Sequence, residues 1–85
     1  MDANERTQQL QLVGERLISI RVNLGYDVES AATLAHVDPE RLADAEEGAA
    51  PLREDELERL ADAYGVGVSA FFGGRVTPFS YLAGA

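Results

Sequence analysis

The sequence contains no cysteine, no lysine and no tryptophan, and the first two absences exclude whole classes of chemistry. Without cysteine, the chain has neither disulfide bonds nor a thiolate metal site, which fits a reducing compartment. Without lysine, Schiff-base catalysis is excluded. Apolar runs are all shorter than the roughly 18 residues of a membrane-spanning helix, and the polar beginning MDANERTQQ does not resemble a secretion signal. We therefore expect a cytoplasmic protein that does not associate with membranes.

Catalytic and ligand-binding patterns are equally scarce. His36 is the only histidine, so the serines lack a convincing general base, and the sequence has no glycine-rich phosphate loop. The acidic residues within 43–48 do not follow the spacing of a calcium-binding loop. We predict that the protein is not an enzyme and holds no metal or other cofactor, and we interpret His36 as a turn residue.

Negative charge dominates the sequence. Fifteen acidic residues against seven arginines give a net charge of −8 over 85 residues. Twelve of those acids and three arginines fall between residues 27 and 63, a local balance of −9. Proteins that bind nucleic acids usually carry the opposite sign. Apolar residues still make up 46% of the chain, which is enough for one small globular domain.

The spacing of apolar residues predicts a first helix from about Gln9 to Leu24. Gly14 lies inside this helix, where glycine is unfavourable, and indicates a close approach by a neighbouring element. Gly25 is placed to end the helix. The side chains predicted to face the core are Leu10, Val13, Leu17, Ile20 and Leu24, widened by Ile18 and Val22.

Residues 28–48 predict two short helices separated by a tight turn, the arrangement of a helix-turn-helix unit. Asp27 and Asp38 stand where the two helices would begin, and aspartate is a favoured residue at that capping position. His36 and Val37 make the turn. In proteins with this unit, the second helix commonly enters the major groove of DNA.

A fourth helix is predicted from about residue 53 to 64 and a short fifth helix from about 69 to 72. Together the elements predict an all-α, five-helix domain over residues 9–74, with a flexible end at 1–8 and a short tail at 75–85. The side chains predicted to meet at its centre are Leu17, Leu42, Leu60 and Phe71.

These motifs resemble the Cro/C1-type (XRE) helix-turn-helix family over residues 13–74. The matching pieces are GERL at 14–17, LADAYGV at 60–66 and VSAFFGG at 68–74. The resemblance implies a lambda-repressor-like fold, as found in bacterial regulators. It also implies a structural ion pair between Arg21 and Glu46, because family members commonly pair an arginine of the first helix with the glutamate that ends the recognition helix.

The positions that the resemblance assigns to DNA contacts hold unsuitable residues. Val28 stands where the family usually has a glutamine that anchors a phosphate, and the loop 49–51 offers no basic side chain. The positions assigned to base contacts hold Pro39, Glu40, Arg41 and Asp44. Ionised carboxylates only accept hydrogen bonds and repel the phosphates of DNA. The sequence therefore predicts against DNA binding by this helix.

We predict a transcriptional regulator that resembles an antiactivator. Its fold no longer binds DNA and instead sequesters a DNA-binding activator by contacting the basic surface of that activator. The predicted partner-binding residues are Asp38, Glu40, Asp44 and Glu47 on the acidic helix, with Val28, Leu34, Phe79, Tyr81 and Leu82 as apolar contacts. The apolar tail either packs back over the first helix or the Phe71–Phe72 helix, or it forms a surface for a partner or a weak homodimer. The alternatives are a DNA-binding XRE-family transcription factor and an antitoxin-like interaction module with neither role.

Overall fold

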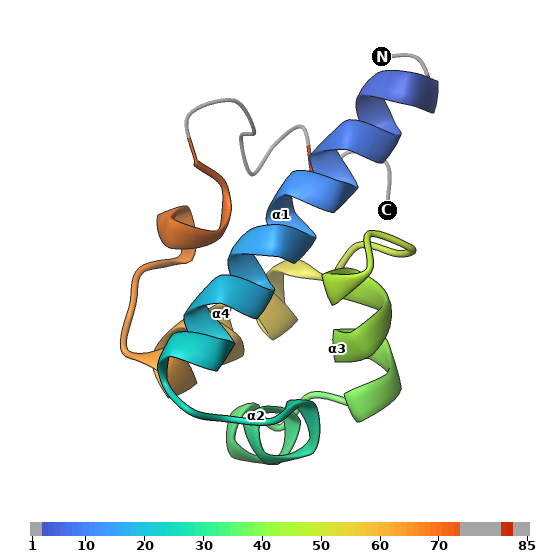
Figure 1. The fold of residues 1–85 in the computed structure, drawn as a ribbon. Coiled ribbons are helices and arrows are strands. Elements are labelled where there is room, and N and C mark those ends of the chain that lie inside the picture. The colour runs from blue at the N-terminus through green and yellow to red at the C-terminus, as the bar shows by residue number, and fades with distance from the viewer. Residues whose placement is uncertain (1–2, 74–80, 83–85) are drawn as a thin grey trace.

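The computed structural model describes residues 3–73 and 81–82 of the chain. Those residues form four α-helices and a short 3-10 helix, without any strand (Figure 1). The elements are α1 (Ala3–Asn23), α2 (Val28–Ala35), α3 (Pro39–Glu46), α4 (Glu54–Tyr64) and the 3-10 helix η1 (Val68–Phe71). The all-α class is confirmed, but the count of five α-helices is wrong. The last element has four residues between Gly67 and Gly73, which is too short to extend beyond 3-10 geometry.

The first helix begins at Ala3, so the predicted start near Gln9 is wrong. Arg6 holds this end of α1 against the C-terminal part of the chain. Its Nη1 donates a hydrogen bond to the carbonyl oxygen of Tyr81, and its guanidinium lies 5.8 Å from the centre of the Tyr81 ring. This contact joins residues 75 positions apart, and local apolar periodicity carries no information about it.

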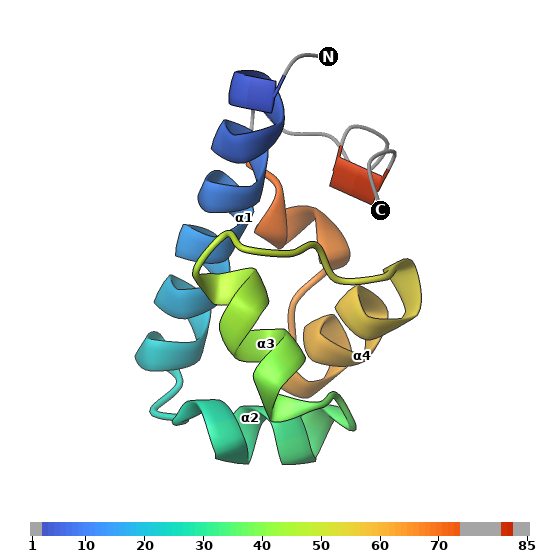
Figure 2. The same cartoon turned by 90° about the vertical axis from the view of Figure 1, so that its right-hand side faces the viewer.

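The helices surround one core, to which each of the five elements contributes at least one fully buried side chain. Figure 2 shows α3 between α1 and α4, while α2 lies across the end of the bundle. α1 packs against α3 and η1, and α2 packs against α3 and α4. The four side chains predicted at the centre, which are Leu17, Leu42, Leu60 and Phe71, are all 0% exposed. This part of the sequence prediction is confirmed.

The apolar face of α1 is narrower than predicted. Val22 is 58% exposed and Ile18 is 37% exposed, so neither belongs to the core. Nine residues separate Val13 from Val22, which is two and a half helical turns, so the two side chains project in opposite directions. Leu24 does lie in line with Val13, but it follows the last residue of the helix and is 46% exposed.

The close approach predicted at Gly14 is present. A Cβ atom at this position would lie 2.5 Å from the backbone oxygen of Glu46 and 2.7 Å from that of Ala45. Neither distance is compatible with a side chain unless the backbone moves. Gly14 therefore allows α1 to lie directly against the C-terminal end of α3.

Both short helices begin at a capping aspartate, and the turn between them is flanked by the His36 cap of α2 and the Asp38 cap of α3. Oδ1 of Asp27 accepts a hydrogen bond from the backbone N–H of Ser30 at the start of α2, and Oδ1 of Asp38 accepts one from Glu40 at the start of α3. His36 takes a left-handed backbone conformation, with φ of 57°, that ends α2. These local contacts set the direction in which α3 leaves the turn.

Candidate functional site

The outward side of α3 carries three carboxylates. Glu40, Asp44 and Glu47 are exposed, and their spacing of four and then three residues places them on one side of the helix. Leu42 and Ala45 occupy the opposite side and are buried. In a helix-turn-helix unit, this outward side is the one that meets a DNA groove.

Asp38 and Val28 contribute less to this surface than predicted. The carboxylate of Asp38 is exposed, but one of its oxygens caps α3 by accepting from the N–H of Glu40 at 2.8 Å. Val28 is only partly exposed and packs against the core. Each of these two residues thus also stabilises the fold.

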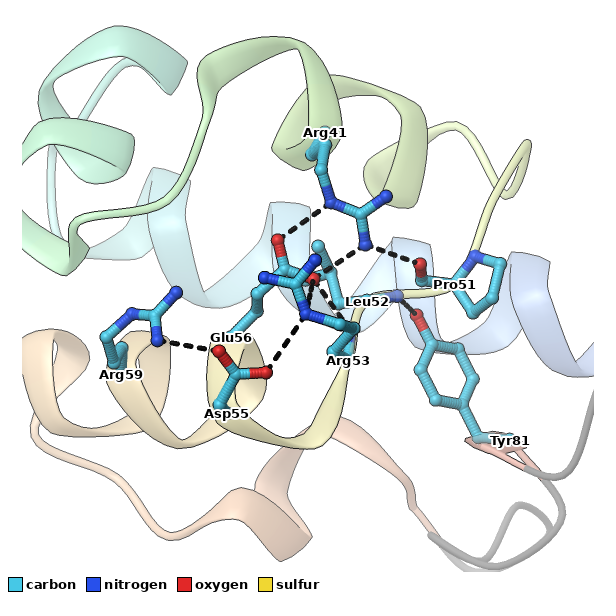
Figure 3. A network of polar contacts seen from close by, with 8 residues as sticks. All are labelled: Arg41, Pro51, Leu52, Arg53, Asp55, Glu56, Arg59 and Tyr81. Atoms are coloured by element: carbon cyan, nitrogen blue, oxygen red, sulfur yellow. Dashed lines mark hydrogen bonds and ion pairs between the residues drawn. The ribbon is translucent and has the colours of Figure 1, made fainter. Parts of the chain in front are cut away.

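Arg41, the one basic residue of α3, is turned away from this surface and toward α4 (Figure 3). Its Nε donates to Oε2 of Glu56 at 2.8 Å, and its Nη2 donates to Oε1 of Glu56 at 2.6 Å and to the carbonyl oxygen of Pro51 at 3.2 Å. The Glu56 carboxylate is almost fully buried, at 2% exposed. Arg41 is therefore held in a two-point ion pair with a buried carboxylate, although its own side chain is 38% exposed.

The Arg41–Glu56 ion pair stabilises the charged form of both groups. Hydrogen bonding to Glu56 raises the pKa of Arg41. The hydrogen bonds from Arg41 lower the pKa of Glu56 below its ordinary value, and a further hydrogen bond from the backbone N–H of Arg53 acts in the same direction, against the effect of burial. The sequence analysis missed Glu56. Its position three residues after Arg53 suits a capping box, but that pattern does not indicate a pairing with Arg41.

Two further arginines near the start of α4 are also occupied by a carboxylate (Figure 3). Asp55 accepts from Nε of Arg53 at 3.1 Å and from Nη1 of Arg59 at 2.8 Å. These two hydrogen bonds lower the pKa of Asp55 to about 2. Arg53 and Arg59 thus share the single carboxylate of Asp55, which compensates only part of their positive charge.

Arg21 and Glu46 pair as predicted. Nε of Arg21 donates to Oε2 of Glu46 at 2.7 Å, its Nη2 donates to Oε1 at 2.9 Å, and its Nη1 donates to the carbonyl oxygen of Tyr26 at 2.8 Å. The side chains are 13% and 6% exposed. Hydrogen bonding to Glu46 raises the pKa of Arg21. This ion pair joins the end of α1 to the end of α3. It also makes a fourth arginine unavailable to an external binding partner.

The charge left uncompensated on the described surface is negative. Within residues 3–73 and 81–82, the exposed carboxylates that make neither an ion pair nor a hydrogen bond are Glu15, Glu29, Glu40, Asp44, Glu47, Glu54, Glu58 and Asp62. Of the arginines there, Arg21, Arg41, Arg53 and Arg59 are in ion pairs, whereas Arg16 is exposed and its Nη1 donates only to the carbonyl oxygen of Ala70, at 3.5 Å. In the described part of the chain, exposed and unpaired carboxylates therefore outnumber unpaired arginines.

Among the apolar tail residues predicted to contact a partner, Tyr81 is not available at the surface. Tyr81 is 1% exposed, its ring packs edge-to-face on Phe72 at 5.6 Å, and its hydroxyl accepts a hydrogen bond from the backbone N–H of Leu52 at 2.8 Å. The prediction that Tyr81 binds a partner is therefore wrong, because a buried aromatic ring completes the core. Leu82 is partly buried against the same core. Phe79 lies outside the described residues.

Leu34 is exposed as expected, at 51%, but on a different side from the α3 carboxylates. It borders two hollows, one lined by residues of α2 and α4 and the other by residues of α2. The predicted partner-binding residues thus divide into an acidic side of α3 and a separate apolar position on α2.

Within the described ranges, no group of three histidine, cysteine or acidic residues is placed to hold a metal ion. None of the helices in the same part of the chain is long and apolar enough to cross a membrane.

Comparison with known proteins gives matches of sequence and of fold. A family model described as a helix-turn-helix domain matches residues 12–70. The restriction-modification controller protein C.AhdI from Aeromonas hydrophila is 25% identical, with a TM-score of 0.74 over 76% of this chain and 98% of that protein. No curated protein sequence matches the chain.

Two further solved structures have the same fold. The clp gene regulator ClgR from Corynebacterium glutamicum is 24% identical, with a TM-score of 0.69 over 74% of this chain and 67% of that one. An HTH_3 family transcriptional regulator from Vibrio cholerae is 21% identical, with a TM-score of 0.73 over 78% of this chain. The match covers only 37% of that longer protein.

Proposed function

This chain belongs to the helix-turn-helix domain family, and we propose that it regulates transcription by binding a protein with a basic surface instead of DNA. Its family and fold are those of XRE-type transcription regulators. The proposed partner is a DNA-binding activator, which the acidic side of α3 would hold by its DNA-binding surface. The protein would then act as an antiactivator.

The observation that carries this proposal is the inward position of Arg41. Affinity for duplex DNA comes largely from basic side chains that neutralise phosphates, and effective binders make about 6–10 such contacts. The outward side of α3 offers Glu40, Asp44 and Glu47, while the one arginine of the helix is bound to Glu56. Releasing Arg41 would leave the buried carboxylate of Glu56 without its partner, which is energetically costly.

A cationic partner suits the same surface. Carboxylates arranged at three- and four-residue spacing repel one another by a few tenths of a kcal/mol for each pair, so they do not serve the stability of the domain. Opposite charge on a partner would compensate this repulsion, accelerate association and suppress wrong partners. The α3 surface would thereby present to the activator the negative charge that DNA presents.

A DNA-binding XRE-family factor is the second candidate, and the likeness to the controller protein C.AhdI favours it. Such a factor would need its cations from a source other than the described face of α3, because the arginine there is paired. Non-specific binding to random duplex at low salt separates the candidates. A DNA-binding protein shifts the mobility of the duplex under these conditions, whereas we expect this protein to leave it unshifted.

The decisive variant reverses two charges, Glu40→Lys with Asp44→Lys. We expect it to fold normally, since both side chains are exposed, and to lose binding to the activator that co-purifies with the wild-type protein. Wild-type protein should inhibit binding of that activator to its promoter DNA, with inhibition weakening steeply as salt rises. The reversed protein should not inhibit it.

The matched control is Glu54→Lys with Glu58→Lys, which reverses two exposed and unpaired carboxylates that are also four residues apart, but on α4. This control should inhibit the activator as the wild type does. If the α3 variant inhibits as strongly as the control, the acidic side of α3 is only a solvated face and the proposal is wrong.

A further inference from the structure

A second surface of the molecule combines an exposed apolar side chain with two adjacent hollows. Leu34, on α2, lines both of them and so forms the ridge that they share. The first hollow, of about 390 Å³, is lined by Leu34, Ala35, His36, Arg59, Asp62 and Ala63. The second, of about 440 Å³, is lined by Glu29, Ser30, Thr33 and Leu34.

The first hollow exists because its floor is built of small residues. Ala35 and Ala63, from α2 and α4, end at Cβ, so the space beside the isobutyl group of Leu34 stays open. A leucine that is 51% exposed beside such a space leaves apolar surface in contact with water. Covering that surface with an apolar side chain is favourable at roughly 25 cal/mol for each Å².

The second hollow has a different chemistry. Its rim carries the carboxylate of Glu29, which makes no ion pair in the described part of the chain, and the hydroxyls of Ser30 and Thr33. A carboxylate and two hydroxyl oxygens can all accept hydrogen bonds. This hollow therefore suits a cationic side chain with several N–H donors.

The charge around both hollows favours a basic partner over a second copy of this chain. Asp62 borders the first hollow and Glu29 the second, and both carboxylates are exposed and unpaired. The one arginine present, Arg59, is paired at 2.8 Å with Asp55, a carboxylate that it shares with Arg53. Another copy would bring the same acidic rim and be repelled, whereas a basic segment would be attracted.

We propose that the Leu34 ridge and its two hollows form a second docking site for a basic segment of the protein partner. One apolar side chain of that segment occupies the hollow over Ala35 and Ala63. A neighbouring arginine or lysine occupies the other hollow and pairs with Glu29, while Asp62 attracts further positive charge. The inference rests on the proposed function in taking the partner to be a basic protein.

The test uses two synthetic peptides and isotope-labelled protein. The first peptide is amphipathic, with leucine and lysine at helical spacing, and the second keeps the lysines but replaces every leucine with serine. We expect the first peptide to shift the amide signals of Leu34, Ala35, His36 and Ala63. We expect the second peptide to bind at least about tenfold more weakly, because it lacks the apolar anchor.

Matched variants identify the docking residues. Leu34→Ser should weaken binding of the amphipathic peptide by about tenfold or more. Leu24→Ser, at a similarly exposed leucine directly after α1, should change it by less than about twofold. Glu29→Gln should weaken binding by about two- to fivefold, the size expected for an exposed ion pair. Glu15→Gln, at an exposed and unpaired glutamate of α1, should leave it unchanged.

Several outcomes would overturn the inference. If Leu24→Ser and Leu34→Ser weaken peptide binding equally, the peptide makes only non-specific apolar contacts. If both peptides bind the wild type equally well, the hollow over Ala35 is not used. A dimer in sedimentation equilibrium that Leu34→Ser dissociates would identify the occupant as a second copy.

The same titration on the Glu40→Lys, Asp44→Lys protein separates this inference from the proposed function. Signals at Leu34 and Ala63 that still shift in this protein support the second docking site on its own. If peptide binding is lost there while the α3 surface of the wild type responds, the docking site is wrong and the acidic side of α3 stands alone. If neither surface responds in the wild type, both proposals fail.

Discussion

At the scale of single residues, Glu56 decides what the recognition helix presents to its surroundings. Its two carboxylate oxygens accept from the guanidinium of Arg41, and one of them also accepts from the backbone N–H of Arg53. A buried carboxylate with these partners stays ionised, so Arg41 stays paired with it. The anionic character of α3 thus depends on a residue of α4, fifteen positions further along the chain.

Replacing Glu56 with glutamine tests this role. Because the pKa of Glu56 is lowered from 4.5 in the folded protein, its charge stabilises the fold above that pH, and the stabilisation is lost as pH falls through the lower folded pKa. We expect Glu56→Gln to reduce the free energy of unfolding by about 1–3 kcal/mol at neutral pH. This loss of unfolding free energy is smaller than the loss on breaking a fully buried ion pair, because the Arg41 side chain is 38% exposed and can be hydrated.

Denaturant unfolding at neutral pH and at successively lower pH measures this effect. The difference between the wild type and Glu56→Gln should shrink as the pH falls below about 4.5, because the carboxylate then takes up a proton on unfolding. It should be smallest below the lowered pKa of the folded protein, where the wild-type carboxylate is protonated in both states. Glu54→Gln, at an exposed and unpaired neighbour, should change stability by less than about 0.5 kcal/mol at any pH. A difference that does not vary with pH would assign the effect of Glu56 to packing and not to charge.

At this scale the sequence predicts contacts only where the residues lie close along the chain or belong to a recognisable motif. The caps formed by Asp27 and Asp38 follow from residue type and position. The pair Arg21–Glu46 follows from the family resemblance. The direction of the Arg41 side chain does not follow from the sequence. Its residue type alone suggests an arginine that contacts DNA bases, and its partner lies in another helix.

At the scale of elements, the approach of α1 to α3 depends on one glycine. The missing Cβ of Gly14 lets the backbone oxygens of Ala45 and Glu46 come within contact distance of α1. The same approach brings the end of α3 to Arg21, whose ion pair with Glu46 ties the two helices together. The position of the acidic helix relative to α1 thus follows from a residue that makes no side-chain contact.

Alanine at position 14 should therefore destabilise the protein, although alanine favours a helix by about 1 kcal/mol over glycine. Its Cβ would lie 2.5 Å from the oxygen of Glu46, and both close atoms belong to the backbone and cannot turn aside. We expect a net loss of about 1–3 kcal/mol, the usual cost of overpacking. Denaturant unfolding measures it, with Ser19→Ala at an exposed position of α1 as the control. A Gly14→Ala protein as stable as that control would mean that α1 and α3 can separate freely.

The sequence predicts the elements well where periodicity and caps agree, as in α2, α3 and α4. The sequence predicts neither the extent of the buried face of α1 nor the start of that helix correctly. The stripe containing Ile18 and Val22 looked apolar in sequence, but only the side that meets α3 and η1 is covered. The start of the helix depends on Arg6 and Tyr81, a contact between the two ends of the chain. Which apolar residues are buried is a property of the packing partners and not of the helix itself.

At the scale of the whole molecule, Tyr81 joins three parts of the protein that are distant in sequence. Its carbonyl oxygen accepts from Arg6 of α1, its ring packs on Phe72 after η1, and its hydroxyl accepts from the backbone N–H of Leu52 in the segment between α3 and α4. That segment also carries Pro51, whose carbonyl oxygen accepts from Arg41. Tyr81 therefore supports the loop that follows the recognition helix.

Tyr81→Phe isolates the hydroxyl from the rest of this contact. The ring would keep its packing on Phe72, but the buried N–H of Leu52 would lose its acceptor, and leaving such a group unsatisfied costs about 1–3 kcal/mol. We expect a loss of that size in unfolding free energy, together with faster hydrogen exchange of the Leu52 amide. Tyr26→Phe is the matched control, because the hydroxyl of Tyr26 makes no hydrogen bond within the described part of the chain.

Tyr81→Ala extends the same test to the whole side chain. Deleting a buried aromatic ring costs about 3–5 kcal/mol, so this variant should be clearly less stable than Tyr81→Phe. If both variants keep wild-type stability and the Leu52 amide exchanges no faster, the ends of the chain are not joined through Tyr81. The loop after α3 would then be held by Arg41 alone, and the acidic surface would not depend on the C-terminal part of the chain.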